Sequence, residues 1–141
     1  MSTRREFVGE AARLLAGGTL VCGAIGCARE HRPPPLFETT VDVASLDADG
    51  ANLVTSAHGL DGAPILVIRD APGKFHALSM QCTHEGCPVR APVRGVITCP
   101  CHGSQYDLDG NVLQGPAQFP LGRYETAYHR FAKRLTVRVD S

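Results

Sequence analysis

The sequence has 141 residues, enough for one domain with or without a tail, and its 14 Lys and Arg side chains are balanced by 14 Asp and Glu side chains. The lack of a basic excess argues against a nucleic-acid-binding protein, and 43% hydrophobic residues with 20% charged residues is too apolar for an intrinsically disordered chain. Trp is absent and only 6% of residues are aromatic, whereas six residues are Cys, so we expect something besides the burial of large side chains to support the fold.

Residues 1–28 are predicted to be an export signal. Arg4 and Arg5 precede a mostly apolar run from Leu14 to Ala28, and the glycines in that run would weaken an ordinary buried helix. A basic pair followed by an apolar segment resembles a twin-arginine export signal, a route that typically carries proteins already folded around their cofactor. We therefore expect the protein on the periplasmic side of a bacterial inner membrane.

The fate of this segment after export stays open between three alternatives. We rank an uncleaved membrane anchor first, although the apolar run is shorter than the ~20 residues that cross a bilayer. A lipid anchor on Cys27 comes second, because Ala24-Ile25-Gly26-Cys27 resembles a lipobox with Ala24 where Leu is usual. Cleavage near Ala28 and release comes third. Residues 29–35 end in three prolines and are predicted to be an extended linker.

Residues 36–141 are predicted to form an all-β domain of short antiparallel strands, a sandwich or a barrel. Strand-like segments occur at 36–43, 63–69, 74–80, 95–99 and 135–139, and no stretch after Pro35 has a helical period over ten or more residues. We expect residues 70–73 to form a hairpin turn and residues 107–111, which contain Asp109-Gly110, to form a second tight turn.

Four of the six cysteines lie in two short boxes that also contain histidine. The first box is Cys82-Thr83-His84-Glu85-Gly86-Cys87, and the second runs from Cys99 to Asp107 and includes Cys101 and His102. Each box can offer a metal one thiolate and one imidazole, so two loops can supply four ligands of a kind that suits zinc or an iron–sulfur centre. A structural zinc site would leave two cysteines without a role. A set of disulfides alone, with three possible pairings, would leave both Cys–His patterns unexplained.

The two boxes resemble those of the Rieske iron–sulfur proteins, especially the high-potential subgroup of quinol–cytochrome c oxidoreductases and their photosynthetic counterparts. The resemblance implies a β domain with its cluster-binding loops at one tip. It also extends to Gly115-Pro116-Ala117, which is similar to the proline loop of the family, although Gln118-Phe119-Pro120-Leu121 follows where Pro and Leu are usual. By the same resemblance, one iron of a [2Fe–2S] cluster is ligated by Cys82 and Cys99, the other iron by His84 and His102, and a disulfide joins Cys87 to Cys101.

Ser104 and Tyr106 carry hydroxyls that are expected to tune the cluster. In the high-potential subgroup the matching hydroxyls donate hydrogen bonds to a bridging sulfide and to a ligand cysteine sulfur, which here would be Cys82. Such bonds favour the added electron, and so does the replacement of two thiolates by neutral imidazoles. By resemblance, His102 is expected to contact the quinol oxygen, and His84 to lie on the side where the electron leaves.

The leading hypothesis is a membrane-tethered electron-carrier subunit rather than a stand-alone enzyme. It would accept an electron and a proton from quinol and pass the electron to a c-type cytochrome, with cytochrome b-type and c-type subunits as its partners. One alternative is an exported Rieske ferredoxin that serves another oxidoreductase, such as a molybdenum oxidase. A remote alternative is a zinc-binding structural module.

The remaining polar motifs are expected to have surface or structural roles. The basic cluster 130–134 is predicted to be a solvated turn, with a cytochrome-docking patch as the minor alternative. Residues 47–50 resemble the start of a calcium loop but lack the later carboxylates, so we predict a turn. The histidines outside the two boxes have no ligand partners nearby in the sequence; they are His31, His58, His76 and His129.

Overall fold

The computed structural model describes residues 34–140, and within this range all regular structure is β. The prediction of an all-β domain is therefore confirmed. The described residues contain no helix that could cross a membrane. The expected export signal with Arg4, Arg5 and Cys27, and the linker up to residue 33, lie outside the described residues.

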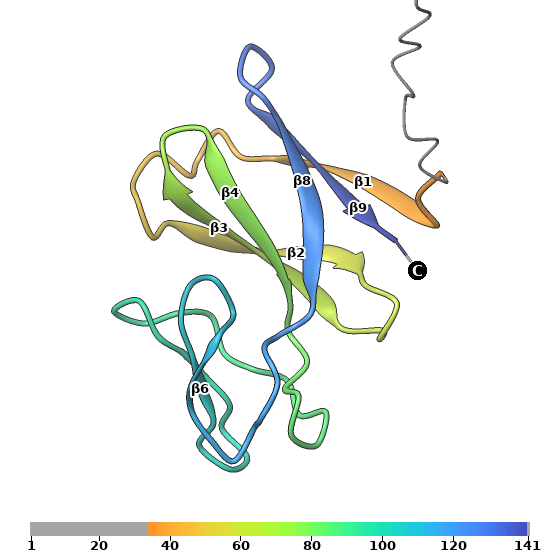
Figure 1. Ribbon diagram of the computed structural model, residues 1–141. Coiled ribbons are helices and arrows are strands. Elements are labelled where there is room, and N and C mark those ends of the chain that lie inside the picture. The colour runs from red at the N-terminus through yellow and green to blue at the C-terminus, as the bar shows by residue number, and fades with distance from the viewer. Residues whose placement is uncertain (1–33, 141) are drawn as a thin grey trace, which may run out of the picture. The chain divides into compact units, whose positions relative to one another are not determined.

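Six strands form one antiparallel sheet that twists and curls toward a barrel (Figure 1). β8 is central to it, because it pairs with β9 on one side and with β4 on the other. In sheet order the strands are β1 (Phe37–Asp42), β9 (Arg134–Val139), β8 (Arg123–His129), β4 (Lys74–Ser79), β3 (Pro64–Ala71) and β2 (Asn52–His58).

A smaller sheet lies below the large one in Figure 1 and consists of β5 (Ile97–Thr98), β6 (Gln105–Tyr106) and β7 (Val112–Gln114). It belongs to the segment 80–122, which leaves the large sheet after β4 and returns to it at β8, the neighbour of β4. Backbone hydrogen bonds from Ser79 N to Gly122 O (2.8 Å) and from Met80 N to Pro64 O (3.0 Å) close the base of this segment. The segment is thus held at both ends by the large sheet.

Two apolar clusters form the core, and β3 contributes to both. All four residues from Ile65 to Ile68 are fully buried, and because side chains alternate along a strand, Ile65 and Val67 enter one cluster while Leu66 and Ile68 enter the other. The first cluster fills the large sheet together with residues of β4 and β9. The second packs the large sheet against segment 80–122 and includes Cys82, Cys99 and Tyr106. Burial on both faces explains why β3 reads as a continuous apolar run.

Five of the nine strands in the described residues were predicted from the sequence, whereas β2, β6, β7 and β8 were not. The expected strands at 36–43, 63–69, 74–80, 95–99 and 135–139 contain β1, β3, β4, β5 and β9 or most of their residues, and the expected turn at 107–111 joins β6 to β7. β2 and β8 were not predicted, because none of their residues is fully buried and their apolar residues are interrupted by Asn, Ser, Thr, Glu, Arg and His. β6 and β7 are too short to show a period.

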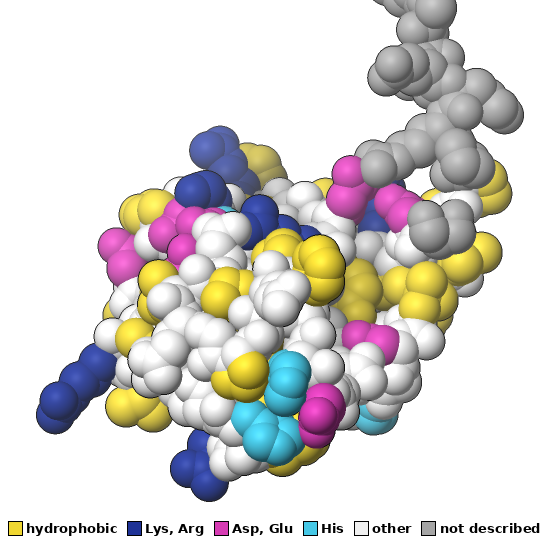
Figure 2. Space-filling model, turned by 60° about the horizontal axis from the view of Figure 1, so that its bottom comes forward, with side chains coloured by type: hydrophobic (Ala, Val, Ile, Leu, Met, Phe, Trp, Pro, Cys, Tyr) yellow, Lys and Arg dark blue, Asp and Glu magenta, His cyan; other side chains and the backbone are white. Residues whose placement is uncertain are grey.

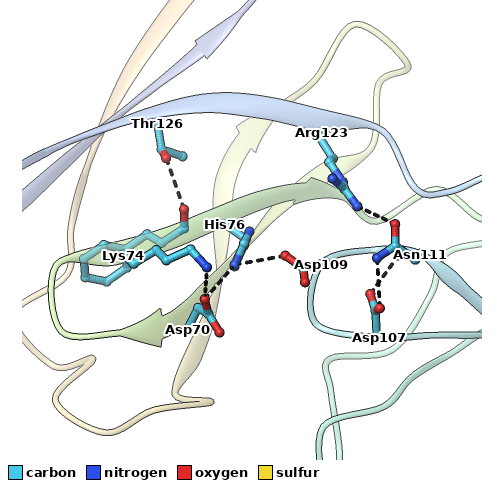
Figure 3. Close-up of polar contacts among 9 residues, drawn as sticks. Asp70, Lys74, His76, Asp107, Asp109, Asn111, Arg123 and Thr126 are labelled. Atoms are coloured by element: carbon cyan, nitrogen blue, oxygen red, sulfur yellow. Dashed lines mark hydrogen bonds and ion pairs between the residues drawn. The ribbon is translucent and has the colours of Figure 1, made fainter.

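A polar seam joins the large sheet to the turn 107–111 (Figure 3). His76 Nε2 on β4 lies 3.4 Å from an Asp70 oxygen at the end of β3 and 3.3 Å from an Asp109 oxygen of the turn. At the other side of the turn, Arg123 on β8 donates a 2.7 Å hydrogen bond to Asn111 Oδ1. Gly110 packs closely between these contacts, since a Cβ at this position would lie 3.2 Å from Leu78. The turn is therefore fixed to the sheet by both polar and apolar contacts.

The other predicted turns form at the surface. Gly50 adopts a left-handed conformation (φ 81°) in the turn before β2, and its N–H donates to Arg69 O. Residues 130–133 of the basic cluster form the turn between β8 and β9, and Arg134 begins β9. Phe131 in this turn is exposed, and Arg130 stacks over its ring at 4.7 Å.

We predict that Asp70→Asn lowers the stability of the protein near neutral pH but not at strongly acidic pH. Hydrogen bonds from Lys74 and then from His76 hold the pKa of Asp70 below its usual range. A carboxyl whose folded pKa is lowered stabilises the fold above its unfolded pKa of about 3.9, and this contribution is lost as the pH falls through the folded pKa. Melting temperatures measured by circular dichroism should therefore differ between wild type and variant at pH 6, and the difference should shrink progressively as the pH is lowered below about 3.9. The control is Asp47→Asn, which removes an exposed carboxylate away from Lys74 and His76. A difference in melting temperature between wild type and Asp70→Asn that stayed constant with pH would contradict the prediction.

Candidate metal centre

The two Cys–His boxes form two loops with the same backbone pattern. In the first loop Cys82 N donates to Cys87 O (2.8 Å) and Gly86 N donates to Cys82 O (2.9 Å). In the second loop Cys99 N donates to Ser104 O and Gly103 N donates to Cys99 O, at the same sequence offsets. Gly86 and Gly103 both adopt left-handed conformations, which a residue with a Cβ enters only at a cost. Each loop is therefore a tight turn that starts at a buried cysteine.

The loops present sulfur inside and nitrogen outside. The free thiols of Cys82 and Cys99 belong to residues that are 2% and 1% exposed, whereas the side chains of His84 and His102 are 29% and 45% exposed. In Figure 2 histidine side chains gather at the surface of this end of the molecule, with an acidic side chain beside them. The site is thus asymmetric, with a dry side and a solvent side.

The two imidazoles face each other through the same ring atom. Nδ1 of His84 lies 3.2 Å from Nδ1 of His102, and the rings are nearly perpendicular at 86°. Two nitrogens that bind the same metal ion, each at about 2.0–2.1 Å, lie roughly 3.0–3.4 Å apart, depending on the nitrogen–metal–nitrogen angle. The pair therefore fits two ligands of a shared metal ion.

The sulfur of Cys82 is surrounded by hydrogen-bond donors. Tyr106 Oη lies 3.2 Å from Cys82 Sγ, and the Ser104 hydroxyl and the His84 backbone N–H are also directed at this sulfur. Burial alone would raise the pKa of Cys82, but the hydrogen bonds from Tyr106, from the His84 backbone and from Cys99 and Ser104 outweigh it, and the net pKa is lowered. A lowered pKa favours the thiolate, which is the form that binds metals.

The two hydroxyls are held in place by other groups. Ser104 is fully buried, and its Oγ accepts a 3.0 Å hydrogen bond from Ala117 N. The hydroxyl proton of Ser104 is therefore free to be donated toward the sulfur of Cys82. Burial and the bond to Cys82 raise the pKa of the Tyr106 phenol, so it stays a donor. Thr83, which the sequence did not single out, contacts Tyr106 Oη at 3.1 Å and donates to Phe119 O.

A disulfide joins Cys87 of the first loop to Cys101 of the second, as the resemblance implied. Its two sulfurs and that of Cys99 lie within 4.8 Å of one another, so the crosslink sits directly against the free thiol. The segment 115–121, with a cis peptide bond between Gly115 and Pro116, closes a third side. An open hollow of about 220 Å³ lies beside His84 and is lined by Thr83, His84, Pro116, Gln118 and Phe119.

The donors do not converge on one point, which argues against a single zinc ion. Ligand atoms of a tetrahedral site with 2.0–2.3 Å bonds lie about 3.3–3.8 Å apart and would all fall within 4.8 Å. Among the described residues, the groups of three or more donors that meet this limit are Cys87, Cys99 and Cys101, and His84, Glu85 and His102. Neither group combines a ligand thiol with an imidazole. Two sulfurs on one side and two nitrogens on the other fit a centre with two metal ions, as in a [2Fe–2S] cluster with mixed ligands.

All six residues singled out in the sequence for the cluster are brought together here. Glu85 was not singled out in the sequence, although it directly follows His84 in the first box. Its two carboxylate oxygens lie 3.9 Å from His84 Nε2 and 3.8 Å from His102 Nδ1.

Comparison with known proteins gives consistent matches. A family model for the Rieske [2Fe-2S] domain matches residues 39–125, which include every site residue. The cytochrome b6-f complex iron-sulfur subunit of Synechococcus elongatus is 33% identical over 138 residues, covering 84% of this chain and 74% of that protein. The plasma membrane Rieske protein PetC3 from Synechocystis PCC 6803 superposes with a TM-score of 0.60 at 31% identity, covering 72% of this chain and 99% of that one. A chain of a hyperthermophilic respiratory complex III superposes with a TM-score of 0.55 at 29% identity, covering 69% and 72%.

We predict that replacing Cys87 and Cys101 together by Ser lowers the free energy of unfolding. A crosslink that spans 14 residues restricts the unfolded chain, and its loss is expected to cost roughly 3 kcal/mol. Denaturant unfolding of the wild type and the double variant measures the difference, and reduction of the wild type should reproduce it. Alkylation of the denatured, unreduced wild type should leave both residues unmodified, and labelling of either would contradict the assignment.

Proposed function

The chain belongs to the Rieske [2Fe–2S] domain family and carries a cluster of that type, and from this premise we propose that it is the iron–sulfur subunit of a membrane quinol–cytochrome c reductase. In this proposal it accepts one electron, together with a proton, from a quinol and passes the electron to a c-type cytochrome. Its relatives are named as subunits of cytochrome b6-f complexes and of a respiratory complex III, which supports an electron-transfer role within a cytochrome complex.

The observation that carries the proposal is the exposure of the two imidazoles at the tip, above two buried thiols. We assign Cys82 and Cys99 to the inner iron and His84 and His102 to the outer iron. The cluster supplies one-electron oxidation and reduction. The protein supplies a buried, hydrogen-bonded side that holds the sulfur ligands and an open side at which a donor can approach a ligand ring.

The orientation of the rings suits the transfer of a proton alongside the electron. With the Nδ1 atoms facing each other, each ring leaves its Nε2 atom for contact outside the site. His102 is the more exposed of the two, and we assign it the contact with the quinol hydroxyl, whose proton Nε2 would accept. We assign His84 to the side from which the electron leaves toward the cytochrome.

The cellular setting is part of the same proposal. The paired arginines and the apolar run at the start of the sequence support export by the twin-arginine route, with the domain on the periplasmic side and tethered to the inner membrane. The partners would then be cytochrome b-type and c-type subunits and the quinol pool of that membrane.

The function can be tested in membranes that contain the full chain with its partner subunits. Quinol-dependent reduction of the c-type cytochrome should be lost in Cys82→Ser, which removes a cluster ligand, and kept in Glu38→Gln, which alters only a surface ion pair on β1. Electron paramagnetic resonance of the same membranes reports the cluster. Full quinol–cytochrome activity in Cys82→Ser membranes would contradict the proposal and favour service to another oxidoreductase.

We predict that Tyr106→Phe and Ser104→Ala each lower the reduction potential of the cluster. Each variant removes a donor that favours the more negative, reduced state, and the loss of one hydrogen bond to a charged group corresponds to roughly 60–130 mV for a one-electron couple. Redox titration followed by circular dichroism measures the shift. Tyr128→Phe, which removes a tyrosine hydroxyl far from the cysteines, is the matched control. Unchanged potentials in both site variants would show that the hydroxyls have only packing roles.

A further inference from the structure

Glu85 places a negative charge between the two exposed histidines. Its side chain is 62% exposed, and its two oxygens lie 3.9 Å from His84 Nε2 and 3.8 Å from His102 Nδ1. Within residues 34–140 no Lys or Arg side chain forms an ion pair with Glu85. Among the described residues, no permanent cation is therefore in direct contact with this charge.

The backbone of the first loop fixes where this charge lies. Gly86 turns the chain in a left-handed conformation, its N–H donates to Cys82 O, and the next residue is tied to the second loop by the disulfide. Glu85 stands at the apex of this turn, on the solvent side of the site, whereas the hydroxyls of Ser104 and Tyr106 act on the buried side. The two sides of the site thus carry groups of opposite electrostatic effect.

We propose that the Glu85 carboxylate lowers the reduction potential of the cluster and offsets part of the increase that Ser104 and Tyr106 produce. Reduction adds one negative charge to a centre whose outer ligands lie about 4 Å from a carboxylate, and like charges at that distance repel each other. The carboxylate therefore opposes the added electron, whereas the buried hydroxyls stabilise it. This inference rests on the cluster of the proposed function but not on the identity of the electron donor or acceptor.

The test is a redox titration of the purified, cluster-loaded full chain at low ionic strength and one fixed pH. Glu85→Gln keeps the shape of the side chain and removes its charge. At a fixed solution potential, the ratio of reduced to oxidised cluster should rise about three- to tenfold, and tenfold corresponds to 59 mV for a one-electron couple. Glu85→Lys should raise the potential further, and Glu85→Asp should stay near the wild type because it keeps the charge.

Ionic strength separates an electrostatic effect from a structural one. The side chain is exposed, so the difference between wild type and Glu85→Gln should shrink in 1 M salt, where the screening length is about 3 Å. A rearranged loop would shift the potential without regard to the sign of the charge or to salt. Glu38→Gln, on the first strand of the large sheet, should leave the potential unchanged.

The outcomes distinguish this inference from the proposed function. If Glu85→Gln has an intact cluster spectrum and the wild-type potential at low salt, the inference is wrong and the proposed function stands. A shift of equal sign in Glu85→Gln and Glu85→Asp that persists in high salt would also overturn it. A wild-type protein that binds no iron–sulfur cluster would contradict both.

Discussion

The sulfur atoms of Cys82 and Cys99 are buried in the apolar layer that packs segment 80–122 against the large sheet, and the orientation of the whole site depends on this shared burial. Leu66 and Ile68 of β3 belong to the same layer. Since each cysteine starts a tight turn at the edge of that layer, the histidine two or three residues further along is carried to the surface. The packing of the core thus also places the candidate ligands, and for this reason we expect metal binding to be coupled to folding.

The same arrangement separates two kinds of electrostatic control. The hydroxyls on the buried side contact Cys82 where solvent does not reach, so in the proposed function we expect their effect on the potential to be strong and independent of salt. A carboxylate on the exposed side acts through water, so its effect is weaker and changes with ionic strength and with anything that covers the tip. A protein built in this way can set a coarse potential from its core and adjust it from its surface.

Part of the fold could be predicted from the sequence, because some strands are buried on both faces. Residues 65–68 are an uninterrupted run of Ile, Leu and Val, the sequence pattern of a short strand that is buried on both faces, and the structure buries them in two clusters. β8 could not be predicted in this way, since its side chains are half-buried and it becomes a strand by pairing with both β4 and β9. The contacts of His76 with Asp70 and Asp109 could not be predicted from the sequence either, because the three residues come from separate elements and share no periodic spacing.

The sequence by itself determined the chemical types of the candidate ligands, because each box holds a cysteine and a histidine within a few residues, a spacing that one loop can present to a metal centre. Only the tertiary structure decided that the thiols are buried and the imidazoles exposed, that Tyr106 reaches Cys82 from 24 residues away, and that Glu85 faces both histidines. The spacing of residues within one loop specifies which side chains that loop can present to a metal. The packing of loops that are distant in the chain decides which of these side chains are buried in the core and which are exposed to solvent.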